Sequence, residues 1–152
     1  LRTNETIIDM KNILLILLTT ILVMSCDETK KVIDTAGNVQ LSGNYNVTEI
    51  NGNTITEKAP NIRFYALDKT IRGNTGCNSF FGSYALDLYA LSFSDIGSTE
   101  MACDQPIMDV ENAFLTALNN TGSYDIQNRV LTLYSKTDRT VLLKANKEVT
   151  ED

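Results

Sequence analysis

The sequence predicts an α+β fold in which an antiparallel, strongly curved β-sheet or partial barrel of short strands packs with one amphipathic helix. Between residues 41 and 146, apolar and polar side chains alternate over short runs, and turn-forming residues separate these runs. One stretch, residues 104–122, instead repeats its apolar residues at helical spacing. Several short strands and a single helix therefore have to share one core.

The first part of this region predicts three strands and a loop. Residues 45–50 alternate and lead into Asn51-Gly52, a dipeptide typical of tight hairpins. Residues 61–66 and the shorter stretch 70–73 are the next two strands. Residues 73–84 are rich in glycine and asparagine, which predicts positive φ angles and a tightly folded loop.

The second part predicts a hairpin followed by the helix. Residues 85–87 and 90–94 form the hairpin, with Leu91 and Phe93 pointing inward. In the helix, Asp104 is a candidate N-cap and Pro106 suits the first turn. One face collects Ile107, either Val110 or Glu111, Phe114 and Leu118 at helical spacing.

Closing strands are predicted after the helix ends at residues 119–122. They occupy residues 124–127, 130–135 and 140–145. The remaining residues are polar and predict a frayed tail over 147–152.

The N-terminal region resembles a bacterial lipoprotein signal. Lys11 precedes an apolar run over residues 13–24, and Ser25-Cys26 ends it. This pattern predicts cleavage after Ser25 and a lipid on Cys26, which anchors the protein to a membrane of the bacterial cell envelope, facing the periplasm or the exterior. An uncleaved anchor helix and a plain secreted protein are the alternatives, although the run is shorter than the roughly twenty residues of a membrane span.

The resulting domain plan has five segments. We expect Met10 to be the initiator, residues 1–9 to be upstream read-through and residues 10–25 to be the signal peptide. Residues 26–40, polar and charged, predict a tether. Residues 41–146 form the folded domain and residues 147–152 the tail.

Composition argues against several classes of function. A net charge of −6 disfavours nucleic acid as a partner. The chain has no histidine, so the commonest general base is missing, and two cysteines beside Cys26 are too few for a metal centre. Asp104, Asp109 and Glu111 cluster in sequence, but acidic residues near a helix start favour capping and the helix dipole over catalysis. We expect no enzymatic activity, no cofactor and no metal.

The other two cysteines, Cys77 and Cys103, are candidates for a disulfide. With Cys26 lipidated, they form an even pair in a compartment that permits such bonds. Two buried free thiols are the alternative.

Two motifs resemble those of META domains, the HslJ-like family. Residues 76–84 are similar to the G-C-N-x-x-x-G-x-Y signature, and residues 99–103 match T-x-M-A-C. The matching positions are Gly76, Cys77, Asn78, Gly82, Tyr84, Thr99, Met101, Ala102 and Cys103. The resemblance implies a small β-rich envelope module with a role in stress or drug tolerance, novobiocin included, and no ligand established for the family as a whole. It places both cysteines in family motifs, consistent with the disulfide.

The stretch from Cys77 to Tyr84 is also a candidate contact loop. Aromatic side chains beside a polar amide, here Asn78, Phe80, Phe81 and Tyr84, can form a binding surface. On this alternative reading the domain is a specific binding module for a peptide, a protease or a small apolar ligand. The opposing interpretation places the aromatic rings in the core, uses Asn78 to satisfy loop backbone groups and buries Met101.

Overall fold

The computed structural model describes residues 26–149. The predicted read-through segment, the signal peptide and the last three residues of the tail lie outside this range. Chain contacts divide the protein into two units, residues 1–35 and residues 36–152. Among the described residues, no helix is both long enough and apolar enough to cross a membrane.

Residues 26–41, of which the sequence predicts 26–40 to be a polar tether, form helix α2 (Cys26–Leu41). In the first unit, Thr35 Oγ1 donates a hydrogen bond to the Lys31 carbonyl, one helical turn earlier. The exposed residues of this helix include the apolar Val32 and Val39. In the second unit, Leu41 is fully buried in the domain core.

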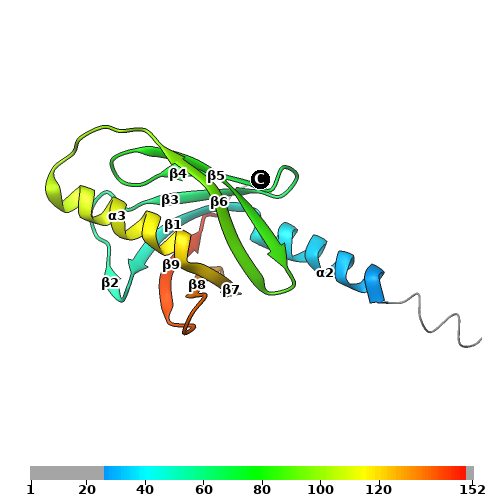
Figure 1. Ribbon diagram of the computed structural model, residues 1–152. Coiled ribbons are helices and arrows are strands. Elements are labelled where there is room, and N and C mark those ends of the chain that lie inside the picture. Colours follow the sequence, from blue (N-terminus) through cyan, green and yellow to red (C-terminus); the bar gives the residue numbers. More distant parts are fainter. Residues whose placement is uncertain (1–25, 150–152) are drawn as a thin grey trace, which may run out of the picture. The chain divides into compact units, whose positions relative to one another are not determined.

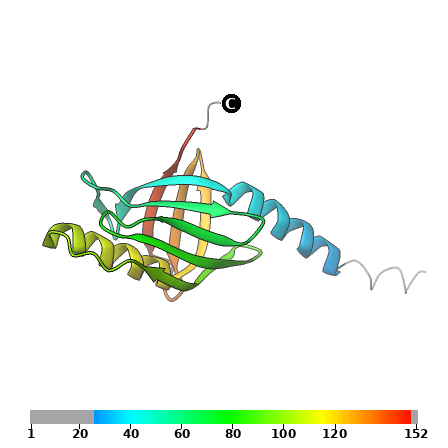
Figure 2. The same cartoon turned by 90° about the horizontal axis from the view of Figure 1, so that it is seen from above.

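The second unit is a closed antiparallel barrel of eight strands (Figure 1; Figure 2). Each strand pairs with its neighbours in chain order, and β1 also pairs with β9, which closes the sheet. A further short strand, β2, forms a hairpin with β1 through Asn51-Gly52. The strands are β1 (Gly43–Ile50), β2 (Asn53–Thr54), β3 (Asn61–Tyr65), β4 (Thr70–Asn74), β5 (Ser79–Asp87), β6 (Ala90–Ser98), β7 (Thr121–Gln127), β8 (Val130–Ser135) and β9 (Val141–Lys147). The predicted α+β class and curved antiparallel sheet are confirmed.

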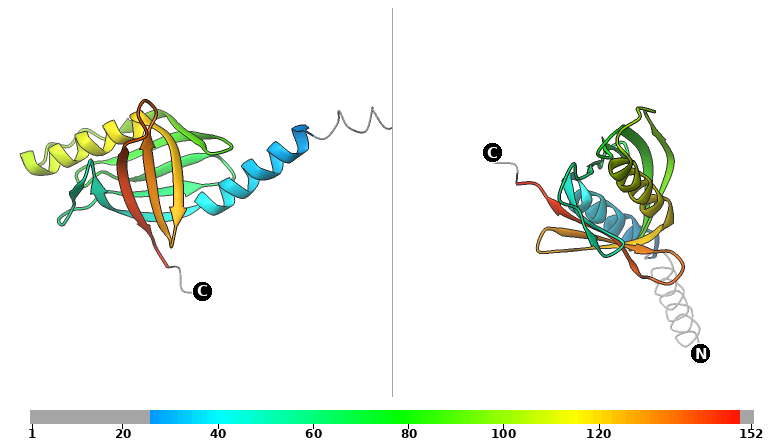
Figure 3. Two further views of the ribbon diagram at one scale, coloured as in Figure 1. Left: turned by 90° about the horizontal axis from the view of Figure 1, so that it is seen from below. Right: turned by 90° about the vertical axis from the view of Figure 1, so that its left-hand side faces the viewer.

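Helix α3 (Gln105–Asn120) lies beside the weakest seam of the barrel. Strands β6 and β7 share a single register pair, Ala90 with Ser123, and α3 is the connection between them. The helix packs against β6, β1, β8 and β9, as its position across the sheet in Figure 3 illustrates. It buries Glu111, Phe114, Ala117 and Leu118. The helix therefore connects β6 to β7 and packs its buried face against the core of the barrel.

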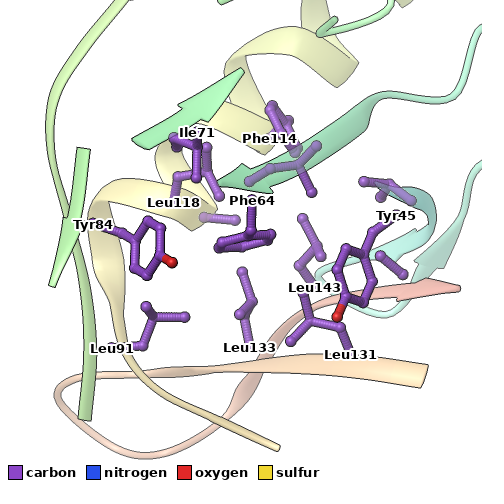
Figure 4. Packing of buried hydrophobic residues seen from close by; sticks show 14 of the residues in the cluster. Tyr45, Phe64, Ile71, Tyr84, Leu91, Phe114, Leu118, Leu131, Leu133 and Leu143 are labelled. Carbon is purple, nitrogen blue, oxygen red and sulfur yellow. The ribbon is translucent and has the colours of Figure 1, made fainter. Parts of the chain in front are cut away.

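The core is continuous and centres on aromatic rings (Figure 4). The Phe64 ring meets Tyr45 and Tyr84 edge to face, with centroids 5.7 Å and 5.4 Å apart. Phe80 and Phe114 make a similar contact at 5.2 Å, which joins β5 to α3. Such edge-to-face pairs add roughly 0.5–1.5 kcal/mol each beyond the burial of their surface.

Several predicted boundaries differ from the observed ones. Residues 79–84, predicted as loop, form the first part of β5, and β6 continues to Ser98 rather than ending at residue 94. Asp104 stands at the N-cap position of α3, but its side chain makes no capping hydrogen bond. The predicted tail begins too early, because Lys147 belongs to β9 and its Nζ donates to the Gln40 carbonyl at 2.9 Å.

Candidate functional site

The four residues between β4 and β5 form a compact turn. The Thr75 N–H donates to the Asn78 carbonyl at 2.7 Å, and the Gly76 N–H donates to Asn74 Oδ1 at 2.7 Å. Gly76 has a φ of +103°, a conformation that favours glycine. A Cβ at this position would also lie 2.6 Å from the Lys58 carbonyl oxygen. The glycine of the first motif is therefore required by backbone conformation and by space.

Glu111 of α3 fastens this turn to the helix. Its carboxylate, only 5% exposed, accepts hydrogen bonds from the Thr75 hydroxyl, from the Asn78 N–H at 3.2 Å and from Asn78 Nδ2 at 3.0 Å. The carboxylate thus accepts hydrogen bonds from three donors of the turn, and as a buried charged group it is itself satisfied by them. The predicted interaction of Glu111 with the helix dipole is wrong, because α3 has no acidic residue in its first turn, whereas the alternative position of Glu111 on the packed face of the helix is correct.

Asn78 links the turn to the segment after β6. Its Oδ1 accepts hydrogen bonds from Thr99 Oγ1 at 2.7 Å and from the Met101 N–H at 2.8 Å, and its Nδ2 donates to the Met101 carbonyl at 3.1 Å. A disulfide between Cys77 and Cys103 joins the same two segments, with Cα atoms 6.0 Å apart. The predicted disulfide is present, and a second, non-covalent link accompanies it.

The motif residues therefore build a junction rather than a contact loop. Asn78, Phe80 and Tyr84 are buried, and only Phe81 of the proposed contact residues is exposed, with 61% of its surface accessible. Strand alternation explains this split, because successive residues of β5 point to opposite faces. The expectation of a buried Met101 is also wrong, since its side chain is 58% exposed.

A hollow of about 760 Å³ lies beside Phe81 on the outer face of the barrel. Strands β4, β5 and β6 and the following Thr99 line it, with Arg72 and Asp95 as its charged side chains. Asp95 has a φ of 54°, and the register of β5 with β6 shifts at this place. A bulge of this kind bends and twists the strand locally.

The hollow needs Gly97 as well as Phe81. Gly97 lies directly opposite Phe81, and a Cβ there would stand 2.7 Å from Phe81 Cζ. The Phe81 ring therefore packs against the backbone of β6 on one side and is accessible to solvent on the other. Sequence reasoning missed Arg72, Asp95 and Gly97 because only strand register brings them together. Alternation around buried Ile71 could at most have placed Arg72 on the outer face.

Two tyrosines, Tyr45 and Tyr84, are buried in the interior of the barrel. Burial raises the pKa of Tyr45 above its ordinary value, and the nearby Tyr124 raises it further. Burial also raises the pKa of Tyr84, again with a smaller contribution from Tyr124. The Tyr84 hydroxyl has no hydrogen-bond partner within residues 26–149.

Over the same described range, no group of three or more histidine, cysteine, aspartate or glutamate side chains is placed to hold a metal ion.

The chain belongs to the META domain family, whose model matches residues 38–148. The matched range covers the whole barrel, helix α3 and the last turn of α2. The predicted family resemblance is thereby confirmed.

Solved structures share this fold at low sequence identity. An NMR structure of a protein from Burkholderia xenovorans superimposes with a TM-score of 0.61 at 24% identity, covering 76% of this chain and 89% of that one. A crystal structure of a DUF4847 family protein from Bacteroides vulgatus gives a TM-score of 0.54 at 20% identity, with coverages of 75% and 99%. A search of curated proteins finds no match.

Proposed function

We propose that this protein is a non-enzymatic binding module, held in the bacterial cell envelope by a lipid on Cys26, that recognises its partner through the hollow beside Phe81. The observation that carries the proposal is the exposed Phe81 ring next to an open hollow of about 760 Å³. Aromatic side chains are enriched at the energetically important centres of interfaces. The binding surface is thus a strand face, not the loop that the motif suggested.

Rigidity of the surrounding structure supports a binding role. The residues before β5 are held by the Glu111 carboxylate, and the residues after β6 are held by Asn78 and by the disulfide. The end of the hollow that the start of β5 and the segment after β6 form together is therefore fixed before any partner arrives. A preformed surface lowers the entropy that ordering would otherwise cost on binding.

The envelope location rests on the sequence. Lys11, the short apolar run and Ser25-Cys26 resemble a lipoprotein signal. A single acyl chain binds a membrane only marginally, whereas two or more chains give lasting attachment. An anchored binding module at the cell surface fits a part in stress or drug tolerance, which we propose as its physiological setting.

Site-specific crosslinking in cells tests the binding function. A photo-reactive amino acid at Ser83, which lines the hollow, is introduced into the full chain, and covalent adducts are detected after irradiation. We expect a defined adduct that Phe81→Ala abolishes and Tyr89→Ala leaves intact. Tyr89 is the matched control, because its aromatic side chain is 76% exposed at the tip of the β5–β6 hairpin and does not line the hollow. Adducts equally strong in both variants, or no adduct at all, would contradict the proposal.

A further inference from the structure

A row of side chains crosses the outer face from β3 to β6. Arg63 stands directly opposite Arg72, Arg72 opposite Phe81, and Phe81 opposite Gly97. Residues directly opposite each other in antiparallel strands point to the same face. Arg63, Arg72 and Phe81 are all exposed, so this face is the outer one.

Arg63 and Arg72 repel each other, because both side chains are positively charged and stand directly opposite each other. Like charges directly opposite each other in a sheet are destabilising. Within residues 26–149, neither guanidinium forms an ion pair with a carboxylate. The Arg63 guanidinium instead lies 5.0 Å from the centroid of the Tyr65 ring, a cation–π contact that orients it. Two arginines that repel each other and form no ion pair among the described residues are suited to bind an anion from a partner.

We infer that this row binds an acidic segment of a protein partner, with carboxylates on Arg63 and Arg72 and an adjacent apolar side chain on Phe81. The inference rests on the proposed function and names the chemistry of its partner. Each guanidinium presents a planar fork of donors that matches a carboxylate. Neighbouring strands are about 4.8 Å apart, so the row from β3 to β5 spans about 10 Å. An extended peptide of about three residues has this length.

The surrounding charges favour such a segment over a densely anionic surface. The whole chain carries a net charge of −6, which repels nucleic acid and anionic membranes. Asp95 lines the hollow beside Arg72, and Asp68 lies with Arg63 around a smaller depression next to β3. The negative charges of these aspartates are compatible with a partner that carries a few localised carboxylates. They disfavour a partner whose surface is negative throughout.

Peptide binding to the full chain in detergent micelles tests the inference. The probe is a fluorescent nine-residue peptide in which two glutamates precede a phenylalanine, and its matched control has glutamines in place of the glutamates. We expect the acidic probe to bind at least tenfold more tightly than the control, measured by fluorescence anisotropy. Arg63→Gln and Arg72→Gln should each weaken binding about tenfold, and Arg72→Lys should also weaken it because the fork is lost. Arg139→Gln, an exposed arginine beyond β8, removes the same charge and should leave affinity unchanged.

Three results would overturn the inference. One is equal binding of the two peptides, and another is equal loss of affinity in the Arg139→Gln and Arg72→Gln variants. The third is binding to phosphatidylglycerol vesicles that depends on both arginines while the acidic peptide does not bind. If the Phe81-dependent crosslink persists in any of these cases, the proposed binding function stands and only its acidic partner is wrong.

Discussion

At the scale of single residues, Glu111 holds the turn before β5, a role that the sequence did not reveal. Its buried carboxylate meets donors from Thr75 and Asn78, so both oxygens serve as acceptors. The neighbouring Asp109, on the same helix, is exposed and accepts a hydrogen bond from Gln105 Nε2. The two acidic residues therefore contribute to stability in different ways, although the sequence shows them only two positions apart.

Glu111→Gln should lower the free energy of unfolding by about 1 to 3 kcal/mol, because an amide presents a donor where the turn requires an acceptor. Urea unfolding of the full chain measures the change, and Asp109→Asn is the control, with a change within about 0.5 kcal/mol. Equal stabilities of the two variants would show that the buried hydrogen bonds do not hold the turn.

Tyr84→Phe should leave stability unchanged or raise it by about 1 kcal/mol at neutral pH, because the buried hydroxyl finds no partner among the described residues. The variant should also tolerate alkali better. Since burial raises the pKa of Tyr84 above its ordinary value, the unfolded chain loses this proton first. Stability is full below about pH 10 and falls as the pH rises toward the folded pKa.

Urea unfolding at neutral pH and above pH 10 measures both effects. The Tyr84→Phe variant should lose less stability over this pH range than the parent chain, and exposed Tyr89→Phe should follow the parent. A steeper alkaline loss in Tyr84→Phe would contradict the assignment. Tyr45, whose pKa burial also raises, keeps part of the alkaline sensitivity in every variant.

At the scale of elements, the sequence predicted most strands because alternation is a local property. Residues 79–84 are the exception, since the glycines and asparagines of residues 73–84 indicated a loop. Gly82 in fact faces the barrel interior, where an added Cβ would stand 3.2 Å from Ile96 Cγ1 and from the Ser94 carbonyl. The glycine is there for close packing between strands, and a single sequence does not distinguish that need from a turn.

The junction between β5 and the segment before α3 has both a covalent and a hydrogen-bonded link. Replacing Cys77 and Cys103 by alanine together should cost about 3.5 kcal/mol, the loop-closure value for a separation of 26 residues. Because Asn78 still holds Thr99 and Met101, the variant should remain folded and keep the Phe81-dependent crosslink. Urea unfolding and crosslinking are measured on the same preparation. A folded variant that lost the crosslink would show that Asn78 alone does not hold the border of the hollow.

At the scale of the whole molecule, closure of the barrel lay beyond the sequence. Pairing of β1 with β9 joins residues almost a hundred positions apart, and no local pattern contains that register. The row of Arg63, Arg72 and Phe81 depends on the same kind of long-range information. The sequence therefore predicted the class of fold and the disulfide, whereas the binding face required strand register.

The anchor gives a prediction that belongs to the whole chain. Protein extracted from membranes should begin at Cys26 and carry the added mass of two or more acyl chains, as intact mass spectrometry measures. Cys26→Ala should release the protein from the membrane fraction. A mass without acyl chains would contradict the lipoprotein assignment and leave the binding face as a separate question.

The most direct test of the central claim is oxidative footprinting of the unmodified protein in intact cells and after purification. In the purified chain, Phe81 and Tyr89 are both largely exposed and both should be labelled. If the face beside Phe81 binds a partner in the envelope, labelling of Phe81 should fall several-fold in cells while labelling of Tyr89 stays the same. Equal labelling of Phe81 in cells and in the purified protein would contradict a binding function for this face.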